Sequence, residues 1–386
     1  MRATPLKYSR SLSGRAGAEV SLKCENLQRA GSFKFRGAYT RLSRLSEEEK
    51  SRGVVAASAG NHAQGVALAA QMLGIQARIY MPVGAPMPKV NATRAYGAEI
   101  EQVGHTLDEA MPHAQEYARE TGAVYIHPFD HPDIVAGQGT CGLEILEQCP
   151  DVKTIVVGVG GGGLIAGISV VIKELKPDVR IIGVQAEGAA AYPTSLEAGR
   201  PIACESMHTM ADGIAVGLPG KVPFRIIAEQ VERVDTVSEE EISQALLHLL
   251  ERSKLVVEPA GGVSVARLLQ GGSQDWEGPV VAVLSGGNID PLLMLRIIRH
   301  GMAAAGRYLQ LRVRVPDKPG NLAQLLTDCA DADANVLEIE HVRTNAALNV
   351  DEVEIALELE TKSSEHCALV LSTLHERGYR ILAAES

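Results

Sequence analysis

The sequence predicts an α/β protein with two lobes, followed by a smaller ferredoxin-like domain of the βαββαβ type. Two stretches of the sequence predict the lobes. In each of them, residues 34 to about 140 and residues 154 to about 290, helical patterns alternate with short apolar strand patterns. Such alternation is typical of parallel sheets covered by helices on both faces. The third observation concerns the small domain: from residue 309 apolar and polar residues alternate with the period of two of half-buried strands.

Length and composition set the broad class of protein. The chain has 386 residues, 46% of them hydrophobic and 22% charged, which is ordinary for a soluble globular protein of two or three domains. Its net charge of -10 argues against a general nucleic-acid binder, and we expect no nucleic-acid partner. The six cysteines are scattered without a CxxC pair, which excludes an obvious zinc motif and favours a reducing, cytoplasmic location.

One uncharged run, residues 154–171, approaches the length of a membrane span, which is about 20 residues. Six glycines lie inside this run, most of them at its centre. A strand, a glycine loop and a buried helix explain that composition better than a membrane helix does. We therefore expect no membrane association.

Local signals define the elements of the first lobe. Residues 19–23 read as a strand that precedes it, and Ser46 with Glu49 forms a capping box for a short helix. Residues 54–57 are a short apolar strand, residues 61–72 a helix and residues 77–81 the next strand, which Pro82 closes.

The second lobe and the C-terminal domain are defined in the same way. Strands are predicted in the second lobe at 155–159, 180–185 and 280–284. In the last domain we expect a strand from 309, a helix from 321, a strand at 336–342, a turn at 345–349, a strand at 353–359, a helix at 364–377 and a strand at 379–382. The predicted domains are therefore 1–300, with a smaller lobe at about 34–140, then a linker at 301–308, and 309–386.

The stretch at 31–38, Gly-Ser-Phe-Lys-Phe-Arg-Gly-Ala, reads as the start of a helix with Ser32 as the N-cap. It places Lys34 in the first turn, between Phe33 and Phe35. A lysine amine is a useful nucleophile only when it is desolvated or close to other positive charge. Taken alone, the stretch fits a lysine beside two core phenylalanines better than a reactive one.

Four further motifs change that interpretation. They are Ser-Ala-Gly-Asn-His at 58–62, four consecutive glycines at 160–163, Glu-Pro-Ala-Gly at 258–261 and Ser-Gly-Gly-Asn at 285–288. With Ser-Phe-Lys-Phe-Arg-Gly, this set resembles the fold-type II pyridoxal-phosphate enzymes, which share the fold of the tryptophan synthase β subunit. It is most similar to the threonine dehydratase (threonine ammonia-lyase) family, and the resemblance covers nearly the whole chain.

The resemblance implies pyridoxal 5'-phosphate as cofactor and β-elimination of L-threonine to 2-oxobutyrate and ammonia, with L-serine as a second substrate giving pyruvate. Lys34 would be the Schiff-base lysine and would then remove the substrate's Cα proton. A glycine loop at a helix N-terminus suits the cofactor phosphate, because backbone N–H groups can approach the anion. The residues expected to bind the cofactor are Lys34, Phe33, Asn61, Gly160, Gly161, Gly162, Gly163, Leu164, Glu258 and Ser285.

Within this set the resemblance implies individual roles. Ser285 would face the pyridine nitrogen, and a hydroxyl there makes the ring a weak electron sink, which suits elimination. Asn61 would contact the cofactor's phenolic oxygen, and Glu258 would lie near the reacting centre. Phe129 and residues 137–140 would line or support the cleft.

The loop at 58–62 is the expected substrate-binding segment, formed by Ser58, Ala59, Gly60, Asn61 and His62. Its backbone N–H groups and the Ser58 hydroxyl suit a carboxylate at a helix N-terminus. His62 is expected to be structural. Serine racemases resemble this chain but carry a second serine where Ala59 stands, so alanine favours elimination over racemisation.

Several alternatives stay open at this point. Gly158, Gly160 and Gly163 also satisfy GxGxxG, with Glu187 near the end of the next strand, so a nicotinamide-dependent oxidoreductase is a rival that the upstream lysine motif disfavours. Serine racemase or serine dehydratase is the alternative within the fold, and a non-catalytic amino-acid sensor is a third. Glu205 and Asp212 are two carboxylates in a loop, and we predict no metal site there.

The C-terminal domain carries its own motif. Residues 315–322, Val-Pro-Asp-Lys-Pro-Gly-Asn-Leu, resemble the first turn of an ACT domain, an amino-acid-sensing module. The resemblance implies an effector, isoleucine or valine, that acts through a homodimer or homotetramer, and it leaves open whether the enzyme serves isoleucine biosynthesis or threonine catabolism. The residues expected to bind the effector are Asp317, Pro319, Gly320, Asn321 and Leu322.

Overall fold

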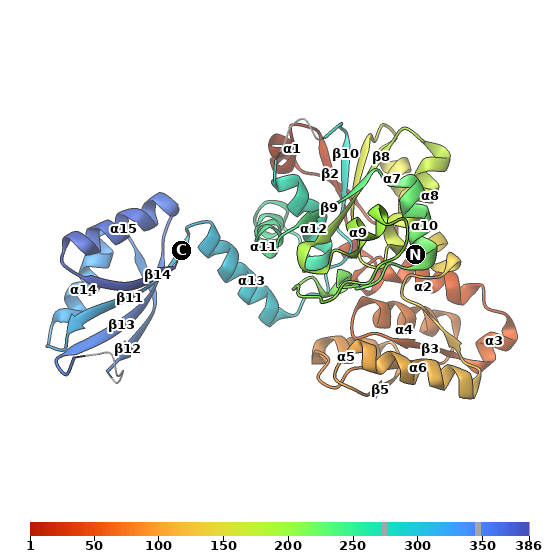
Figure 1. Ribbon diagram of the computed structural model, residues 1–386, viewed down its shortest axis with the longest axis horizontal. Coiled ribbons are helices and arrows are strands. Elements are labelled where there is room, and N and C mark those ends of the chain that lie inside the picture. Colours follow the sequence, from red (N-terminus) through yellow and green to blue (C-terminus); the bar gives the residue numbers. More distant parts are fainter. Residues whose placement is uncertain (272–275, 344–348, 386) are drawn as a thin grey trace. The chain divides into compact units, whose positions relative to one another are not determined.

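A computed structural model of the chain describes residues 1–271, 276–343 and 349–385. Its contacts divide it into two compact units, Met1–Pro291 and Leu292–Ser386. The first unit consists of two α/β lobes, each built on its own sheet (Figure 1).

The small lobe has a four-stranded parallel sheet in the order β5–β4–β3–β6. Helices α2, α4 and α5 pack on one face of this sheet and α6 packs on the other, while the short helix α3 (Glu47–Arg52) joins α2 to β3. The elements are α2 (Lys34–Ser43), β3 (Val54–Ala57), α4 (Asn61–Leu73), β4 (Ala77–Met81), α5 (Met87–Ala95), β5 (Glu99–Gln102), α6 (Leu107–Thr121) and β6 (Val124–Tyr125).

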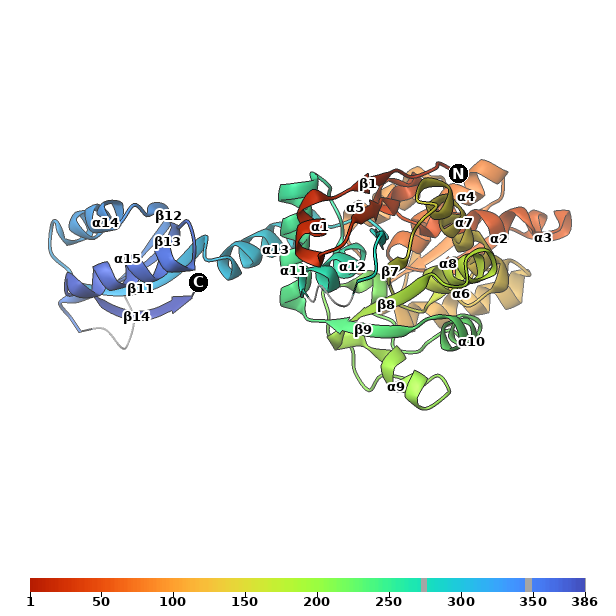
Figure 2. The same ribbon diagram turned by 90° about the horizontal axis from the view of Figure 1, so that it is seen from above.

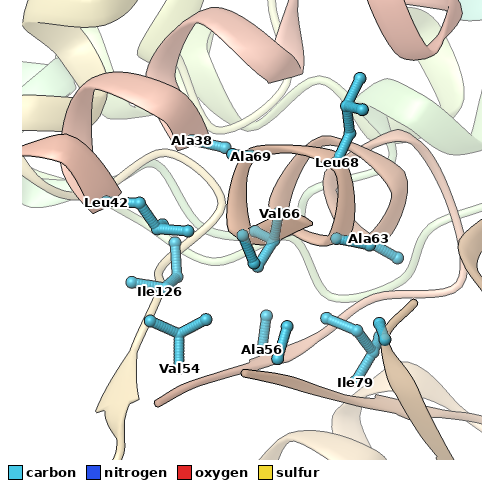
Figure 3. Close-up of a cluster of buried hydrophobic side chains, with 14 of the residues drawn as sticks. Ala38, Leu42, Val54, Ala56, Ala63, Val66, Leu68, Ala69, Ile79 and Ile126 are labelled. Carbon is cyan, nitrogen blue, oxygen red and sulfur yellow. The ribbon is translucent and has the colours of Figure 1, made fainter. Parts of the chain in front are cut away.

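Strand β3 shows why both faces are covered. All four of its residues are buried, and Val54 and Ala56 face α4 while Val55 and Ala57 face α6. In Figure 3, Val54, Ala56 and Ile79 of the sheet lie opposite Val66 of α4. A fully buried aliphatic side chain of this size contributes about 1.5–3 kcal/mol. This core holds the N-terminus of α4 next to the end of β3.

The large lobe has a six-stranded sheet in the order β1–β2–β10–β7–β8–β9, parallel except for β1. Helices α7, α8 and α10 pack on one face, and α1, α11 and α12 lie on the other (Figure 2). The strands are β1 (Leu6–Tyr8), β2 (Val20–Lys23), β7 (Thr154–Gly158), β8 (Arg180–Ala186), β9 (Arg233–Val237) and β10 (Val280–Val283). The helices are α1 (Arg10–Ala16), α7 (Pro132–Gln148), α8 (Gly163–Leu175), α9 (Ala191–Glu197), α10 (Lys221–Gln230), α11 (Glu239–His248) and α12 (Pro259–Leu269).

Helix α7 connects the two cores of the first unit. Its residue Ile134 belongs to the small-lobe core, whereas Val135, Cys141 and Ile145 belong to the large-lobe core. The uncharged run at 154–171 becomes β7, the glycine loop and α8, as predicted. In the described part of the chain, no helix combines the length and the hydropathy that crossing a membrane requires.

The second unit has the predicted βαββαβ order after the helix α13, with an antiparallel sheet in the order β12–β13–β11–β14. Leu309, Leu311, Val313 and Val315 of β11 are buried in its core with residues of α14 and α15. The predicted turn at 345–349 lies, except for its last residue, outside the described residues. The elements are α13 (Pro291–Ala304), β11 (Tyr308–Pro316), α14 (Asn321–Asp331), β12 (Asn335–Val342), β13 (Glu352–Glu360), α15 (Ser364–Glu376) and β14 (Arg380–Glu385).

Two capping predictions had different outcomes. The capping box is confirmed, since the Glu49 N–H donates to the Ser46 hydroxyl and the Ser46 N–H donates to the Glu49 carboxylate. The prediction that Ser32 caps the next helix is wrong. Helix α2 begins at Lys34 after Phe33, and Ser32 is extended and bridges to Gly286. Pairing with the loop after β10 outweighs the capping preference of serine.

Candidate active site

One pocket of about 400 Å³ in the first unit brings the predicted cofactor and substrate residues together. It lies between the lobes, at the carboxyl ends of β3, β7 and β10, where ligands bind in α/β sheets. The predicted residues that line it are Phe33, Lys34, Ser58, Ala59, Gly60, Asn61, His62, Gly160, Gly161, Gly162, Gly163, Leu164, Glu258 and Ser285. The five predicted effector residues lie in the second unit, at the turn from β11 into α14.

Lys34 is the first residue of α2, and its side chain lines the pocket. Its amine donates a hydrogen bond of 3.0 Å to the carbonyl of Pro128 and lies 5.2 Å from the centre of the Phe33 ring. Desolvation of the amine lowers the pKa of Lys34 to about 8, against the opposing effect of Glu258. About a tenth of the amine is therefore neutral, and nucleophilic, at pH 7, far more than for an ordinary lysine.

Backbone pairing places Lys34 opposite Ser285. The Phe33 N–H donates to the Ser285 carbonyl at 3.1 Å, and the Gly287 N–H donates to the Gly31 carbonyl at 2.9 Å. The chain before α2 is thus held against the loop that follows β10.

A buried ion network anchors the other side of α2. Arg36 has no exposed surface, and its guanidinium donates to Glu25 and to Glu144 at distances of 2.7–2.9 Å. Lys23 and Gln148 complete this network around the Glu144 side. Two cations face two carboxylates, so charge is balanced where water is excluded. Residues 137–140 pack against the same helix. The Gln138 side chain lies so close to Gly37 of α2 that a Cβ there would collide with it.

The glycine loop leads directly into α8. Its residue Gly162 is the N-cap of α8 at φ 93°, and no side chain caps the first N–H groups of the helix. A Cβ at Gly161 would collide with the Phe129 ring, and one at Gly162 would collide with the Tyr192 hydroxyl. Glycine is therefore required here by space as well as by conformation. The loop presents free N–H groups at a helix N-terminus, which is the arrangement that binds phosphate.

Glu258 lies at the start of α12, with 3% of its surface exposed. The Asn61 side-chain N–H donates to its Oε1 at 2.6 Å. Burial, together with the nearby charge of Asp212, raises the pKa of Glu258 to about 7. Its carboxyl can therefore hold or release a proton inside the pocket near neutral pH.

The remaining polar groups have distinct surroundings. The Ser285 hydroxyl donates weakly to the Ala260 carbonyl at 3.3 Å, and the Ser58 hydroxyl accepts from the Gly60 N–H at 3.1 Å. The His62 ring contacts the Ile126 carbonyl at 2.8 Å, and burial lowers its pKa to about 3. His62 is therefore neutral and structural.

The pocket chemistry fits pyridoxal phosphate. Lys34 offers an amine for the cofactor aldehyde, and the uncapped N-terminus of α8 offers N–H groups for the phosphate. Ser285 and Asn61 place a hydroxyl and a carboxamide on the same pocket for the ring.

The sequence did not point to Lys89, which also lines the pocket. Its amine forms an ion pair of 2.8 Å with Asp212, and the pair joins α5 of the small lobe to the short 3₁₀ helix Asp212–Ile214 of the large lobe. No motif marks Lys89, because only the tertiary structure brings these lobes together. Within the described residues no group of three or more His, Cys, Asp or Glu is arranged to hold a metal.

Residues 1–286 match the family model described as "Pyridoxal-phosphate dependent enzyme". The chain therefore belongs to the family of pyridoxal-phosphate-dependent enzymes. This assignment removes the nicotinamide alternative, and the glycine loop that suggested it lines the pocket that fits pyridoxal phosphate.

The chain is 48% identical over 379 residues to an L-threonine ammonia-lyase of Thermotoga maritima, covering 98% of this chain and 94% of that protein. Among solved structures it is similar to the processed form of threonine deaminase isoform 2 from Solanum lycopersicum, with a TM-score of 0.74, 39% identity and coverage of 78% and 88%. Maize serine racemase gives a TM-score of 0.73 at 35% identity, with coverage of 76% and 91%. These similarities confirm the resemblance to the threonine dehydratases that the motifs indicated.

Proposed function

We propose that the chain is a pyridoxal-phosphate-dependent L-threonine ammonia-lyase. It converts L-threonine to 2-oxobutyrate and ammonia, and L-serine to pyruvate as a secondary activity. The observation that carries the proposal is the Lys34 amine, with a pKa lowered to about 8, in one pocket with the glycine loop and the loop at 58–62. The similarity to the Thermotoga maritima lyase over nearly the whole chain supports the choice of substrate.

Each group in the pocket has a separate role in the proposed reaction. The bound cofactor supplies the electron sink that makes the substrate's Cα–H bond acidic. The N–H groups at the start of α4, which no side chain caps, bind the substrate carboxylate. The neutral Lys34 amine accepts the Cα proton, and the bond between Cβ and the hydroxyl oxygen breaks. The hydroxyl leaves with the bonding electron pair and takes up a proton to become water. The released enamine tautomerises and hydrolyses to 2-oxobutyrate and ammonia.

One buried acid, Glu258, and one hydroxyl, that of Ser285, lie around the reacting groups. Glu258, with a pKa raised to about 7, keeps a proton within the pocket without adding a full negative charge beside the substrate carboxylate. Ser285 offers the ring nitrogen a hydroxyl, which cannot keep it protonated. A weak electron sink is sufficient for elimination, because the departing hydroxyl carries away the electron pair.

Serine racemisation is the alternative that the similarity to maize serine racemase favours. Ala59 argues against it, since Ala59 lines the pocket and has no group to return a proton from the opposite face. Incubation with L-serine separates the two. A lyase gives pyruvate with little D-serine, whereas D-serine formed at a rate similar to that of pyruvate would favour the racemase.

The visible absorption spectrum of the purified protein with pyridoxal phosphate, before and after addition of L-threonine, tests the main proposal. A visible cofactor band should form in the wild type, and addition of threonine should change the band and produce 2-oxobutyrate. The variant Lys34→Ala should fold, fail to form the band and produce no 2-oxobutyrate. Full activity in this variant would overturn the assignment.

We also propose that the second unit is an ACT domain that binds isoleucine or valine at Asp317, Pro319, Gly320, Asn321 and Leu322. The βαββαβ order and the turn itself support this, since Gly320 has φ 95° and the Asn321 side chain donates to the Pro316 carbonyl. Calorimetric titration with isoleucine, valine and alanine tests the site, and sedimentation tests whether a homodimer or homotetramer responds. Binding of neither isoleucine nor valine would contradict it.

The setting of the enzyme follows from the same proposal. All six cysteines are free, which supports a cytoplasmic location. Inhibition of turnover by isoleucine would indicate a role in isoleucine biosynthesis, because the product would then be the precursor of its own effector. Activity that isoleucine does not inhibit would indicate threonine catabolism.

A further inference from the structure

Asn288 lies behind the pocket lining, where it contacts the pocket residue Asn61. It follows β10 and is not among the described residues that line the pocket. One amide nitrogen of its side chain donates two hydrogen bonds, at 2.7 Å to the Ala30 carbonyl and at 2.8 Å to the Asn61 side-chain oxygen. Both hydrogens of that nitrogen are therefore used, and the two acceptors lie on different elements.

The first acceptor belongs to the turn that delivers Lys34. Ala30 has φ 58° and Gly31 has φ 70°, so two successive residues are left-handed just before α2 begins. A left-handed conformation is unfavourable for alanine, and it persists where the surroundings fix it. A Cβ on Gly31 would overlap the Asn288 carboxamide, so the turn and the asparagine fit only as a pair.

The second acceptor belongs to the small lobe. Asn61 begins α4, and its side-chain nitrogen donates in turn to Glu258 at 2.6 Å. Because Asn288 donates to the Asn61 oxygen, the Asn61 nitrogen must point to Glu258, and a flipped amide would face donor with donor. Asn288 thus determines the direction of a carboxamide that lines the pocket.

We propose that Asn288 is a positioning residue. From the loop after β10 of the large lobe, it holds the Asn61 carboxamide of the small lobe and the turn before Lys34 in fixed positions. The inference rests on the proposed function, because it assigns Asn61 to the cofactor side of the pocket. At metal sites, removing a group that orients a ligand by a hydrogen bond lowers metal affinity or activity by about 10–100-fold, and we expect an effect at the lower end of that range here. We expect Asn288→Ala to weaken pyridoxal phosphate binding by about tenfold and to lower kcat more than it changes KM.

The experiment uses the full chain with pyridoxal phosphate, titrated by the cofactor absorbance, and steady-state kinetics with L-threonine. Asn288→Asp is a second variant that keeps the shape of the side chain but places an oxygen against both acceptors. Asn26→Ala is the matched control, because Asn26 is a buried asparagine of the same region whose amide donates to the Val256 carbonyl and not to Asn61. It should change cofactor affinity less than twofold.

A double-mutant cycle with Asn61→Ala separates positioning from general destabilisation. Because Asn288 also holds the turn before Lys34, the double variant should bind the cofactor worse than Asn61→Ala alone, but by less than the loss that Asn288→Ala causes in the wild type. Fully additive losses, or Asn288 variants that match the wild type in cofactor affinity and kcat, would overturn the inference. A wild type that neither binds the cofactor nor deaminates threonine would instead refute the proposed function.

Discussion

Two lysines of the first unit, Lys23 and Lys34, both have buried amines but differ in the number of their hydrogen-bond partners. The Lys23 amine has no exposed side-chain surface and donates to three acceptors, the Thr4 carbonyl, Glu144 and Gln148, at 2.6–2.9 Å. The Lys34 amine donates to one acceptor, the Pro128 carbonyl. An ammonium has three N–H donors, so Lys23 is fully satisfied and Lys34 is not.

The comparison separates a lysine whose hydrogen-bond donors are all paired from a buried lysine with one partner. Full pairing favours the charged form of an amine, whereas desolvation with few partners favours the neutral form, as the lowered pKa of Lys34 shows. Lys23 lies at the end of β2 and Lys34 at the start of α2, and Arg36 of α2 bonds to the same Glu144 carboxylate as Lys23. Burial alone therefore does not distinguish the two lysines, whereas the number of their hydrogen-bond partners does.

The largest expected effect comes from Lys34→Ala. Loss of the amine should lower turnover of L-threonine by a factor on the order of 10³ or more, because the other lysine that lines the pocket, Lys89, is held in an ion pair with Asp212. Thermal unfolding should change little, since the amine has a single partner. Release of 2-oxobutyrate measures the expected loss of turnover, and circular dichroism during heating measures whether thermal unfolding is unchanged.

The converse substitution is Lys23→Met. It leaves the carboxylates of Glu25 and Glu144 facing one cation, and an unpaired buried charge costs about 3–5 kcal/mol in unfolding free energy. Turnover per folded molecule should stay within about twofold, because Lys23 is remote from the pocket lining. The double variant Lys23→Met with Glu144→Gln serves as control and should recover part of the stability. A large loss of kcat in stably folded Lys23→Met would break the comparison.

A third prediction extends the comparison to a buried acid, Glu258. Its folded pKa is raised from 4.5 to about 7, so the folded protein keeps a proton that the unfolded chain releases between these values. The contribution to stability is present below pH 4.5 and is lost as pH rises through 7. Cofactor-free wild type should therefore lose about 3 kcal/mol over this range relative to Glu258→Gln, since tenfold in an equilibrium constant is about 1.4 kcal/mol.

Urea unfolding of the two cofactor-free proteins at several pH values measures that difference. The Glu258→Gln variant keeps the hydrogen bond from Asn61 and cannot titrate. Parallel pH profiles for the two proteins would show that Glu258 is ionised in the folded state at all of these pH values, contrary to the prediction.

The smallest effect is expected at the ion pair between Lys89 and Asp212. The Asp212 side chain is 62% exposed, so the pair is screened by water and should contribute at most about 1 kcal/mol. Lys89→Met should raise KM for threonine by about two- to fivefold and leave the unfolding free energy nearly unchanged, because the pair joins the lobes at the pocket. Asp212→Asn should give a change of KM in the same direction, and opposite changes in KM for the two variants would contradict a shared role.

Much of the architecture followed from local patterns. The alternation that predicted two parallel sheets and the period of two that predicted β11 are confirmed, because hydrophobic periodicity reports the buried face of each element. The order of strands did not follow, since β2 from the N-terminus pairs with β10 from the end of the unit. That pairing depends on contacts more than 250 residues apart, which no local pattern encodes.

The candidate site also contains residues that local motifs predicted and residues that only the tertiary structure revealed. Lys34, the glycine loop and Ser285 were predicted as site residues because their motifs together resemble a known family, and the structure brings all three to one pocket. Lys89 and Asn288 were not assigned to the site, since a lysine or an asparagine gains its role only from what it touches. Ser32 shows the reverse case, in which a strong local preference was overruled by pairing with Gly286.

The sequence by itself thus determined the elements and the family and predicted the chemistry-bearing side chains, because these depend on local periodicity and on motifs that are short. Only the tertiary structure decided which lysine has all its hydrogen-bond donors paired and which has a single partner. The partners that decide it, Thr4, Glu144 and Gln148 for Lys23 and Pro128 for Lys34, come from distant parts of the chain. Solvent exclusion and hydrogen-bond count are properties of the folded pocket, and they set the protonation on which the proposed reaction depends.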